Sequence, residues 1–242
     1  GALLAMLLVL GGYGALRSLL GGIGRAREAS GTIVAIEHPA AEITTVRCRL
    51  LQGWHGHQPG QFAFVTFDDK EGAHPFTIAS ADRGDQTISF QIKALGDYTK
   101  QLGQRLHAGQ PVRVEGPYGR FDLARCNRRA RQIWIAGGIG ITPFLAWLES
   151  LQAHPDKAPM ADLHYCTRDQ STDAFAPRLL TLCATLPSVQ LHIHDARQGA
   201  KLTASALGVL KNTEIWFCGP TGLAEALRQG MAALGWRPRF HQ

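Results

Sequence analysis

The stretch QIWIAGGIGITPFLAWLESL, residues 132–151, decides the second half of the fold. Its apolar start predicts a buried strand, and its end has the apolar spacing of a helix. Between them, AGGIGITP (Ala136–Pro143) places glycines that let the backbone turn sharply and approach a phosphate. Thr142 suits the cap of the helix and Pro143 its first position. A tight strand-to-helix turn needs glycine anyway, and Pro143 replaces the third glycine of GxGxxG, but the setting favours a dinucleotide-binding turn.

The rest of this half repeats the same alternation of strands and helices. The predicted strands are residues 161–166, 189–195 and 214–218, and the predicted helices are residues 175–186, 203–210 and 222–235. Such alternation is typical of a doubly wound parallel sheet. We therefore expect residues 128–242 to form an α/β domain that binds NAD(P).

Residues 28–124 have a different period. Short segments alternate apolar and polar residues, which predicts strands of an antiparallel sheet. The predicted strands are residues 30–38, 43–51, 61–67, 74–80, 87–95 and 111–116, with a short helix at residues 98–106. Closely spaced strands of this kind form a small antiparallel barrel or sandwich. The expected fold class is an antiparallel β-barrel domain followed by a doubly wound parallel-sheet domain.

The composition is that of a globular protein. Of 242 residues, 45% are hydrophobic and 18% are charged, and the formal net charge is +6. The basic residues are scattered rather than interleaved with aromatics, so nucleic acid is not an expected partner. The excess of positive charge suits an acidic cofactor or an anionic membrane face. No two of the five cysteines are close in sequence, which excludes a CxxC zinc or iron–sulfur motif and fits a reducing environment.

The start of the chain is strongly apolar. Residues 1–16 carry no charge, and arginines follow at positions 17, 25 and 27. The run is shorter than the roughly 20 residues that cross a bilayer, and its basic residues come after it rather than before it, unlike a signal peptide. A helix packed on the protein is a further alternative. We expect residues 1–24 to end a transmembrane helix, with the following domain at the membrane on its cytoplasmic side.

Two motifs of the first half suit a ligand. HPFTIAS, residues 74–80, begins a strand with proline and offers an aromatic ring and a hydroxyl, which can hold a flat ring and hydrogen-bond its edge; an ordinary edge strand also starts this way. IKALGDYT, residues 92–99, places Lys93 and a glycine turn before a short helix, which suits a phosphate. A plain strand-to-helix turn capped by Asp97 is the alternative.

Two motifs of the second half follow predicted strands. CGP (Cys218–Pro220) lies at the carboxyl end of the last one, where ligands bind in open α/β sheets. A buried cysteine is more often a small apolar side chain, but the Gly-Pro after it forms a shelf for a planar ring. Arg168 follows the second strand, where arginine accommodates the 2′-phosphate of NADP and an acid binds a free 2′-hydroxyl. Asp169 comes next, so the alternative is a solvated charge pair.

The histidines form two HxH pairs, His55 with His57 and His192 with His194. Zinc needs three or four convergent ligands, and no third partner is evident for either pair. No metal site is expected. No Gly-x-Ser-x-Gly elbow or pair of acids indicates hydrolysis.

The order of the motifs is distinctive. HPFTIAS, IKALGDYT, EGPYG (Glu115–Gly119), AGGIGITP, HYCTRD (His164–Asp169) and WFCGP follow one another along the chain. This succession resembles the ferredoxin–NADP reductase superfamily over about residues 30–242. The His-Pro-Phe-Thr form narrows the resemblance to the dehydrogenase region of the NADPH oxidase and ferric reductase transmembrane family, and the apolar start is similar to the last membrane helix of such proteins.

The resemblance implies roles for individual residues. Thr77, near flavin N5, and Cys218 would take part in catalysis. Members of the family often end in an aromatic residue that covers the flavin, and Phe240 is the candidate here. The resemblance implies that the flavin ring of FAD contacts His74, Pro75, Phe76 and Thr77, and that the FAD pyrophosphate contacts Lys93, Gly96 and Thr99. It implies that the NADPH pyrophosphate contacts Gly137, Gly138, Gly140, Ile141 and Thr142. The nicotinamide would contact Cys218, Gly219 and Pro220.

The expected function is hydride transfer from NADPH to FAD, with NADH possible. Single electrons would then pass to haem in a missing membrane domain, and on to oxygen or ferric iron. The first rival is a soluble NAD(P)H-dependent flavin reductase that serves an oxygenase or a ferredoxin. The second is a non-catalytic module that binds a nucleotide for regulation. Retention of both HPFT and CGP argues against the second rival, because a sensor needs only one ligand.

Overall fold

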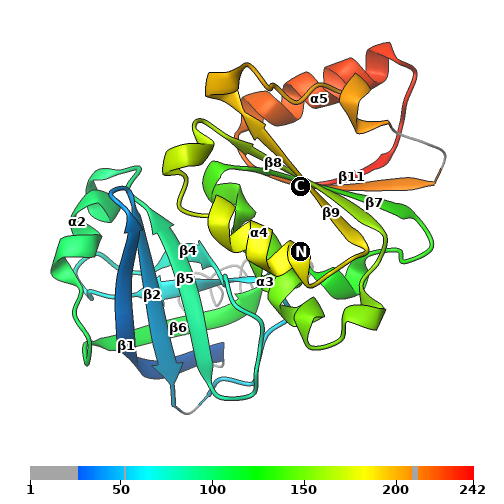
Figure 1. Ribbon diagram of the computed structural model, residues 1–242. Helices are drawn as coiled ribbons and strands as arrows, with labels where there is room; N and C mark the ends of the chain where they lie inside the picture. Colours follow the sequence, from blue (N-terminus) through cyan, green and yellow to red (C-terminus); the bar gives the residue numbers. More distant parts are fainter. Residues whose placement is uncertain (1–26, 52, 209–211) are drawn as a thin grey trace, which may run out of the picture.

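The structure is a computed structural model that describes residues 27–51, 53–208 and 212–242. Its strands form two sheets, one from each half of the chain (Figure 1). Residues 1–24, expected to end a transmembrane helix, lie outside the described residues. Within the described ranges, no helix is long and apolar enough to cross a membrane.

The first sheet is antiparallel between all neighbouring strands. The strands are β1 (Glu28–Ala40), β2 (Ile43–Leu50), β3 (Phe62–Thr66), β4 (His74–Thr77), β5 (Thr87–Lys93) and β6 (Pro111–Tyr118), and helix α2 is Asp97–Arg105. Their order in the sheet is β4-β3-β6-β1-β2-β5. A bridge between Ile78 and Phe90 joins the two edges, β4 and β5, so the sheet curls back on itself.

The alternation seen in the sequence explains this sheet. In β5, Ile88, Phe90 and Ile92 are buried in the core of the first sheet, whereas Thr87 and Ser89 are only half-buried. Successive side chains of a strand point to opposite faces, so one face of the sheet is apolar and packs inward. The expected antiparallel β domain is confirmed.

The second sheet is parallel throughout. Its strands are β7 (Arg131–Gly137), β8 (Ala161–Thr167), β9 (Val189–Asp195), β10 (Thr213–Cys218) and β11 (Arg239–His241), and its helices are α3 (Thr142–Gln152), α4 (Ala176–Ala184) and α5 (Thr221–Ala233). The order is β11-β10-β7-β8-β9. Helix α5 covers one face, and α3 and α4 cover the other (Figure 1). The expected doubly wound sheet is confirmed.

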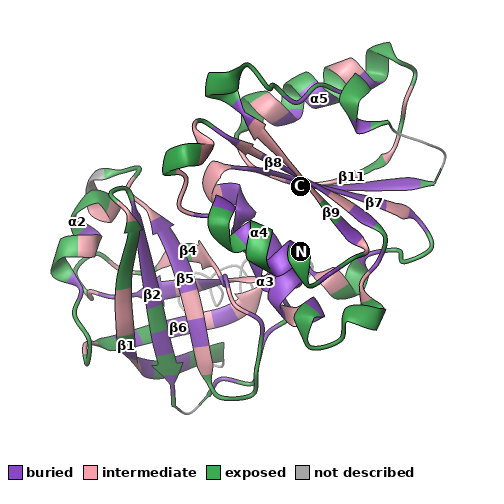
Figure 2. Ribbon diagram, in the orientation of Figure 1, coloured by how far each residue is buried: buried purple, intermediate pink, exposed green. Residues whose placement is uncertain are grey.

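The central strand β7 shows why this sheet is apolar on both faces. Ile133 and Ile135 pack on the side of α5, while Trp134 and Ala136 pack on the side of α3 and α4. The central strands are accordingly buried (Figure 2), as parallel strands covered by helices on both faces are. The chain leaves β7 toward β8 and β9 and later returns to β10 on its other side. The carboxyl ends of β7 and β10 are thus the point where the strand order reverses, at which open α/β sheets bind ligands.

The two sheets meet at an apolar junction. Ile43, at the tip of the β1–β2 hairpin, is buried in the core of the second sheet, and Phe121 packs against the same core. Phe121 stacks on Trp147 of α3 with ring centroids 5.2 Å apart. Trp147 Nε1 also donates a hydrogen bond to the Pro59 carbonyl at 2.8 Å. Helix α3 therefore contacts the first sheet directly.

Two parts of the second half differ from the prediction. Of the helix expected at residues 203–210, the described part contains only a 3-10 turn, Ser205–Leu207. Gly208 follows it with φ of +55°, a left-handed conformation that ends a helix. The sequence analysis also missed β11, which is too short to show an alternating pattern.

Candidate cofactor-binding site

Two adjoining cavities lie where the sheets meet. The first, of about 500 Å³, is lined by β4, the end of β5, the start of α2 and the turn before α3. The second, of about 980 Å³, opens at the carboxyl ends of β7, β8 and β10. The residues that line both cavities are Lys93, Leu95, Ile139, Gly140 and Cys218. The two cavities therefore adjoin along a shared wall.

The four residues of β4, His74–Thr77, all line the first cavity. The His74 ring stacks on Tyr98, with centroids 4.1 Å apart and 14° between the planes. Nε2 of His74 and the hydroxyl of Tyr98 are buried without a hydrogen-bond partner among the described residues. Burial, followed by the nearby carboxylates of Glu71 and Asp68, raises the pKa of Tyr98, so its hydroxyl is a donor at neutral pH. Buried polar groups normally have partners, and these two point to a polar ligand.

The start of α2 borders the same cavity. Thr99 Oγ1 accepts hydrogen bonds from the N–H groups of Leu95 and Gly96, both at 3.0 Å, and so closes the turn before the helix. Lys93 lies at the junction of the two cavities, 3.7 Å from Glu42. The Glu42 side chain is 67% exposed, and exposed ion pairs are weak. An anion at the helix start would compete readily for Lys93.

The loop after β7 forms the wall of the second cavity. It makes a 3-10 turn, Gly138–Ile141, and enters α3 at Thr142. A Cβ atom on Gly140 would lie only 2.2 Å from the Cys218 carbonyl oxygen and 2.9 Å from the Gly219 nitrogen. Only glycine allows this approach, so the motifs AGGIGITP and CGP are held in backbone contact. Thr142 does not cap α3 as expected; it is the first helical residue, and its Oγ1 donates to the Ile139 carbonyl at 3.1 Å.

Cys218 ends β10 and lines both cavities. Burial raises its pKa from 9.0 to about 11, so the thiol is neutral at physiological pH. Gly219 and Pro220 continue the wall of the second cavity. A neutral thiol beside a proline ring offers an apolar surface for a planar ligand.

The far end of the second cavity carries Arg168 and Asp169, which follow β8. Asp169 accepts hydrogen bonds from the Ser171 N–H at 3.0 Å and the Ser171 hydroxyl at 2.6 Å, and it pairs with Arg197. The Ser171 hydroxyl and then the Arg197 guanidinium hold the pKa of Asp169 well below its usual value. Asp169 is thus paired within the protein, and both Asp169 and the exposed Arg168 line the cavity.

Of the residues selected from the sequence for the two cofactors, Ile141 and the candidate cover Phe240 line neither cavity. Ile141 is the exception within the binding motifs. It is buried in the core beneath the loop, while Ile139 lines both cavities. The first cavity contains His74, Pro75, Phe76, Thr77, Lys93, Gly96, Thr99, Gly140, Thr142 and Cys218. The second contains Lys93, Gly137, Gly138, Gly140, Arg168, Cys218, Gly219 and Pro220. Tyr98 was not among the residues predicted from the sequence, although it precedes Thr99 in IKALGDYT.

Residues 30–122 match a family model described as an FAD-binding domain. This range holds nearly the whole first sheet, including the stacked pair His74 and Tyr98. Residues 30–122 are therefore similar to FAD-binding domains. This match, together with the relatives described below, confirms the expected cofactors FAD and NAD(P)H.

Relatives extend the likeness beyond the FAD-binding domain. The chain is 33% identical over 135 residues to the carnitine monooxygenase reductase subunit of Escherichia coli, covering 55% of this chain and 40% of that protein. It is 27% identical over 225 residues to the naphthalene 1,2-dioxygenase system ferredoxin–NAD(P)(+) reductase component of Pseudomonas putida, covering 88% of this chain and 67% of that protein. The chain thus spans between two fifths and two thirds of these relatives.

A solved structure with the same fold covers both sheets. The FAD/NAD-binding domain of nitric oxide dioxygenase from Vibrio cholerae superposes with a TM-score of 0.74 at 18% identity, over 88% of this chain and 96% of that one. The agreement in fold includes the FAD-binding domain and the parallel sheet that follows it.

The residues of the FAD-binding domain suit the cofactor. The partnerless His74 Nε2 and Tyr98 hydroxyl supply polar contacts beside a stacked pair of rings. Thr77 adds a hydroxyl to the same cavity, and Lys93 stands near the start of α2, where helix N–H groups favour a phosphate. An aromatic wall beside a basic helix start matches a flavin with a pyrophosphate.

One expectation from the sequence is wrong, and another lacks support. The relatives are reductase components and subunits of oxygenase and demethylase systems, and they do not support the narrower resemblance to the NADPH oxidase and ferric reductase transmembrane family. The membrane location is wrong on the same grounds. It rested on an apolar run shorter than a bilayer span, and the partners that it implied, a haem-bearing membrane domain with oxygen or ferric iron as acceptor, lose their support.

Two further groups of residues lie away from the cavities. Phe240, the candidate flavin cover, packs on Phe217 and Arg228 on the α5 side of the second sheet. His164 joins the pair His192 and His194 as a third ring, with its Nδ1 3.0 Å from His194 Nε2. The described residues contain no group of three His, Cys, Asp or Glu side chains that could hold a metal ion.

Proposed function

We propose that this chain is the reductase part of an electron-transfer system, moving a hydride from NADPH to FAD and releasing single electrons to a ferredoxin or an oxygenase component. One observation carries the proposal. Motifs from both halves of the chain, selected for a flavin and for a nicotinamide nucleotide, line two cavities that share Lys93, Gly140 and Cys218. The names of the relatives, which are reductase components of oxygenase systems, support the acceptor class.

On the flavin side, the chain positions the ring and neutralises the phosphates. His74, Pro75 and Phe76 would line the flavin ring, and the Thr77 hydroxyl would donate to its reacting edge. Lys93, Gly96 and Thr99 would hold the pyrophosphate through charge and helix-start N–H groups. Thr99 would act mainly by fixing the turn, because its hydroxyl already binds two backbone N–H groups.

On the nucleotide side, the backbone does most of the work. Gly137, Gly138 and Gly140 would let the loop approach the NADPH pyrophosphate, and Thr142 would lie beside it at the start of α3. Cys218, Gly219 and Pro220 would form the surface on which the nicotinamide lies, with a neutral thiol that brings no competing charge. Arg168 would bind the 2′-phosphate, which favours NADPH over NADH.

When bound, the two cofactors supply the redox chemistry: a hydride carries two electrons from the nicotinamide to the flavin, which returns them one at a time to the acceptor. The chain contributes proximity and orientation, because both cavities meet at Cys218 and Gly140. Ile139 lines both cavities and would place an apolar side chain at this meeting point.

The test is direct. The purified protein, supplemented with FAD, should be yellow, bleach on anaerobic addition of NADPH, and reduce a one-electron acceptor such as cytochrome c or a ferredoxin. A regulatory nucleotide-binding module would bind the cofactors but would not bleach. A protein that binds no flavin at micromolar FAD would contradict the proposal outright.

A further inference from the structure

One buried carboxylate connects the two sheets near the cofactor site. Glu149 lies on α3, seven residues after Thr142, which lines the first cavity. At about 1.5 Å of rise per residue, the helix carries it about 10 Å from the cavity. Its side chain is only 5% exposed, and a buried carboxylate is costly unless it is paired and hydrogen-bonded.

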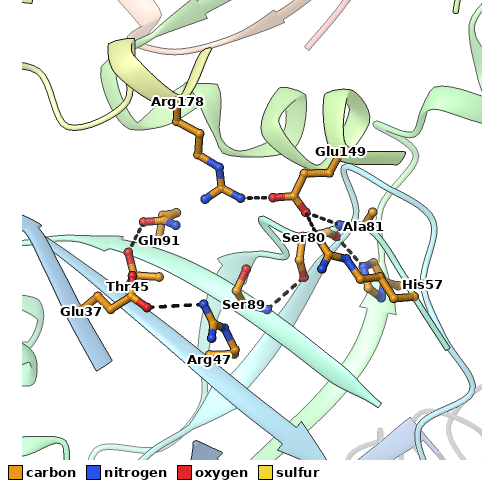
Figure 3. A network of polar contacts seen from close by, with 11 residues as sticks. Glu37, Thr45, Arg47, His57, Ser80, Ala81, Ser89, Gln91, Glu149 and Arg178 are labelled. Atoms are coloured by element: carbon orange, nitrogen blue, oxygen red, sulfur yellow. Dashed lines mark hydrogen bonds and ion pairs between the residues drawn. The ribbon is translucent and has the colours of Figure 1, made fainter. Parts of the chain in front are cut away.

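The partners of Glu149 come from both halves of the chain (Figure 3). Its Oε2 accepts a hydrogen bond from the Ala81 N–H at 3.2 Å and lies 3.8 Å from Arg83 Nη2, both in the FAD-binding domain. Its Oε1 pairs with Arg178 of α4. One oxygen thus holds the first sheet, and the other holds a helix of the second.

The segment that Glu149 contacts, residues 80–82, is itself hydrogen-bonded to other parts of the first half. His57 Nε2 lies 2.8 Å from the Ser80 carbonyl, and the His57 N–H donates to Asp82 Oδ2 at 3.2 Å. The Ser89 N–H donates to Ser80 Oγ at 3.0 Å. Residues 80–82 therefore cannot shift independently of the sheet behind them.

This segment continues the strand that lines the first cavity. Three residues separate Thr77, in that cavity, from Ala81, and the bridge of Ile78 to Phe90 fixes the backbone between them. Strand β4 and helix α3 thus both begin at the cofactor site. The hydrogen bond between Ala81 and Glu149 connects the segment after β4 to α3 at a point farther from the site. Helix α3 has a second hydrogen bond to the first half, from Trp147 Nε1 to the Pro59 carbonyl at 2.8 Å, but it is the bond of Glu149 to Ala81 that joins α3 to the segment continuing β4.

We propose that Glu149 is a positioning residue for hydride transfer: its bond to Ala81 sets the orientation of α3, and of the nucleotide loop that precedes it, against the flavin-facing strand β4. The inference rests on the proposed function. In that reaction the nicotinamide loses a C–H bond with both electrons, the flavin gains them with the hydrogen, and a proton from solvent completes the reduced flavin. A misplacement of about 1 Å between reacting groups can lower such a rate about 100-fold.

The experiment compares two substitutions of similar size. Glu149→Gln keeps an oxygen that accepts the Ala81 N–H, whereas Glu149→Leu removes it. In single-turnover reduction of the FAD-loaded protein by NADPH, the leucine variant should reduce its flavin about 10- to 100-fold more slowly. The glutamine variant should stay within about threefold of wild type, since the hydrogen bond persists. NADPH affinity should change little in either, and the primary deuterium isotope effect should rise in the leucine variant.

A second readout needs no cofactor. Hydrogen exchange of the Ala81 amide in the FAD-free protein should accelerate in Glu149→Leu and remain slow in Glu149→Gln. Glu225→Leu, an exposed position on α5, controls for loss of a surface carboxylate and should leave both readouts unchanged. Should the leucine variant fail to fold, Glu149→Met gives the same loss of the acceptor.

Two results would overturn the positioning role. The first is a leucine variant with a freely exchanging Ala81 amide that still reduces its flavin at the wild-type rate. The second is equal slowing in the leucine and glutamine variants, because the glutamine retains the bond. A wild-type protein that NADPH fails to reduce would instead contradict the proposed function, and this inference would fall with it.

Discussion

The two walls of the cofactor site differ in composition: one is formed mainly by side chains and the other mainly by backbone. The wall from the first sheet presents side chains, namely the stacked rings of His74 and Tyr98, the hydroxyl of Thr77 and the amine of Lys93. The wall from the second sheet is largely backbone, with Gly140 pressed against the end of β10. Substitutions in a wall made of side chains remove one contact at a time. In a wall made of closely packed backbone, a single added carbon atom is enough to force the two segments apart. Substitutions should therefore have graded effects on one wall and abrupt effects on the other.

The largest effect is expected at Gly140. Gly140→Ala places Cβ against the Cys218 carbonyl, so either the loop or β10 must move. We expect NADPH binding to be lost and the free energy of unfolding to fall by about 3 kcal/mol. Urea unfolding and NADPH titration measure the two effects. The control is Gly222→Ala on α5, where no atom lies within 4 Å and the change should stay under about 1 kcal/mol. A Gly140→Ala protein with wild-type NADPH affinity would refute the backbone wall.

Arg168 is an exception to this pattern, because it is a side chain on the backbone wall. Arg168→Ala should lower kcat/KM for NADPH about 10- to 100-fold, the effect of losing a charge-assisted contact with the 2′-phosphate. The value for NADH should barely change. Arg237→Ala, an exposed arginine outside both cavities, controls for net charge. Equal losses with both nucleotides, or a wild type that favours NADH, would exclude this role.

A smaller effect is expected on the side-chain wall. Thr77→Ala should slow flavin reduction about two- to tenfold, in line with about 0.5–1.5 kcal/mol for one hydrogen bond. NADPH binding should be unaffected, and Thr77→Ser should retain most of the rate because it keeps the hydroxyl. Stopped-flow reduction at full FAD occupancy is the measurement. A wild-type rate in the alanine variant would remove Thr77 from the reacting edge.

The smallest effect concerns the thiol on the backbone wall. Burial raises the pKa of Cys218 from 9.0 to about 11, so the thiol should stay protonated and the flavin-reduction rate should be flat between pH 7 and 9. Because the folded state holds this proton more tightly than the unfolded state, stability should fall as pH rises from 9 toward 11. Cys218→Ser should weaken that fall. An inflection of the wild-type rate near pH 8 that is absent in the serine variant would show an exposed, ionising thiol instead.

The sequence predicted those features that have a local signature. Strands such as β5 alternate apolar and polar residues, and the helices around the parallel sheet have apolar faces, so both sheets were predicted close to their observed bounds. The strand motif HPFTIAS and the glycine-rich turn AGGIGITP both lie at the two adjoining cavities. The short turn at Ser205–Leu207 was mistaken for a helix, because apolar spacing alone does not reveal that Gly208 takes a left-handed conformation.

Features that depend on contacts between distant residues could not be predicted. Whether Ile139 or Ile141 faces the cavity depends on how a 3-10 turn rotates the loop, and no periodicity reports this. The bond between Glu149 and Ala81 joins residues 68 positions apart, and neither has a neighbouring motif. The membrane expectation failed for a different reason: it relied on an apolar run shorter than a bilayer span and on the arginines that follow it.

The burial of Ile43 in the core of the second sheet has a consequence for how the molecule can be divided. The hairpin that carries it belongs to the FAD-binding domain, yet its tip completes the apolar interior of the other half. Cutting the chain between the sheets would expose Ile43 and Phe121 on one fragment and uncover Trp147 on the other. We therefore expect the two halves to unfold as one cooperative unit rather than to behave as interchangeable modules. A chimera that exchanges the nucleotide half must carry a matching socket for this hairpin.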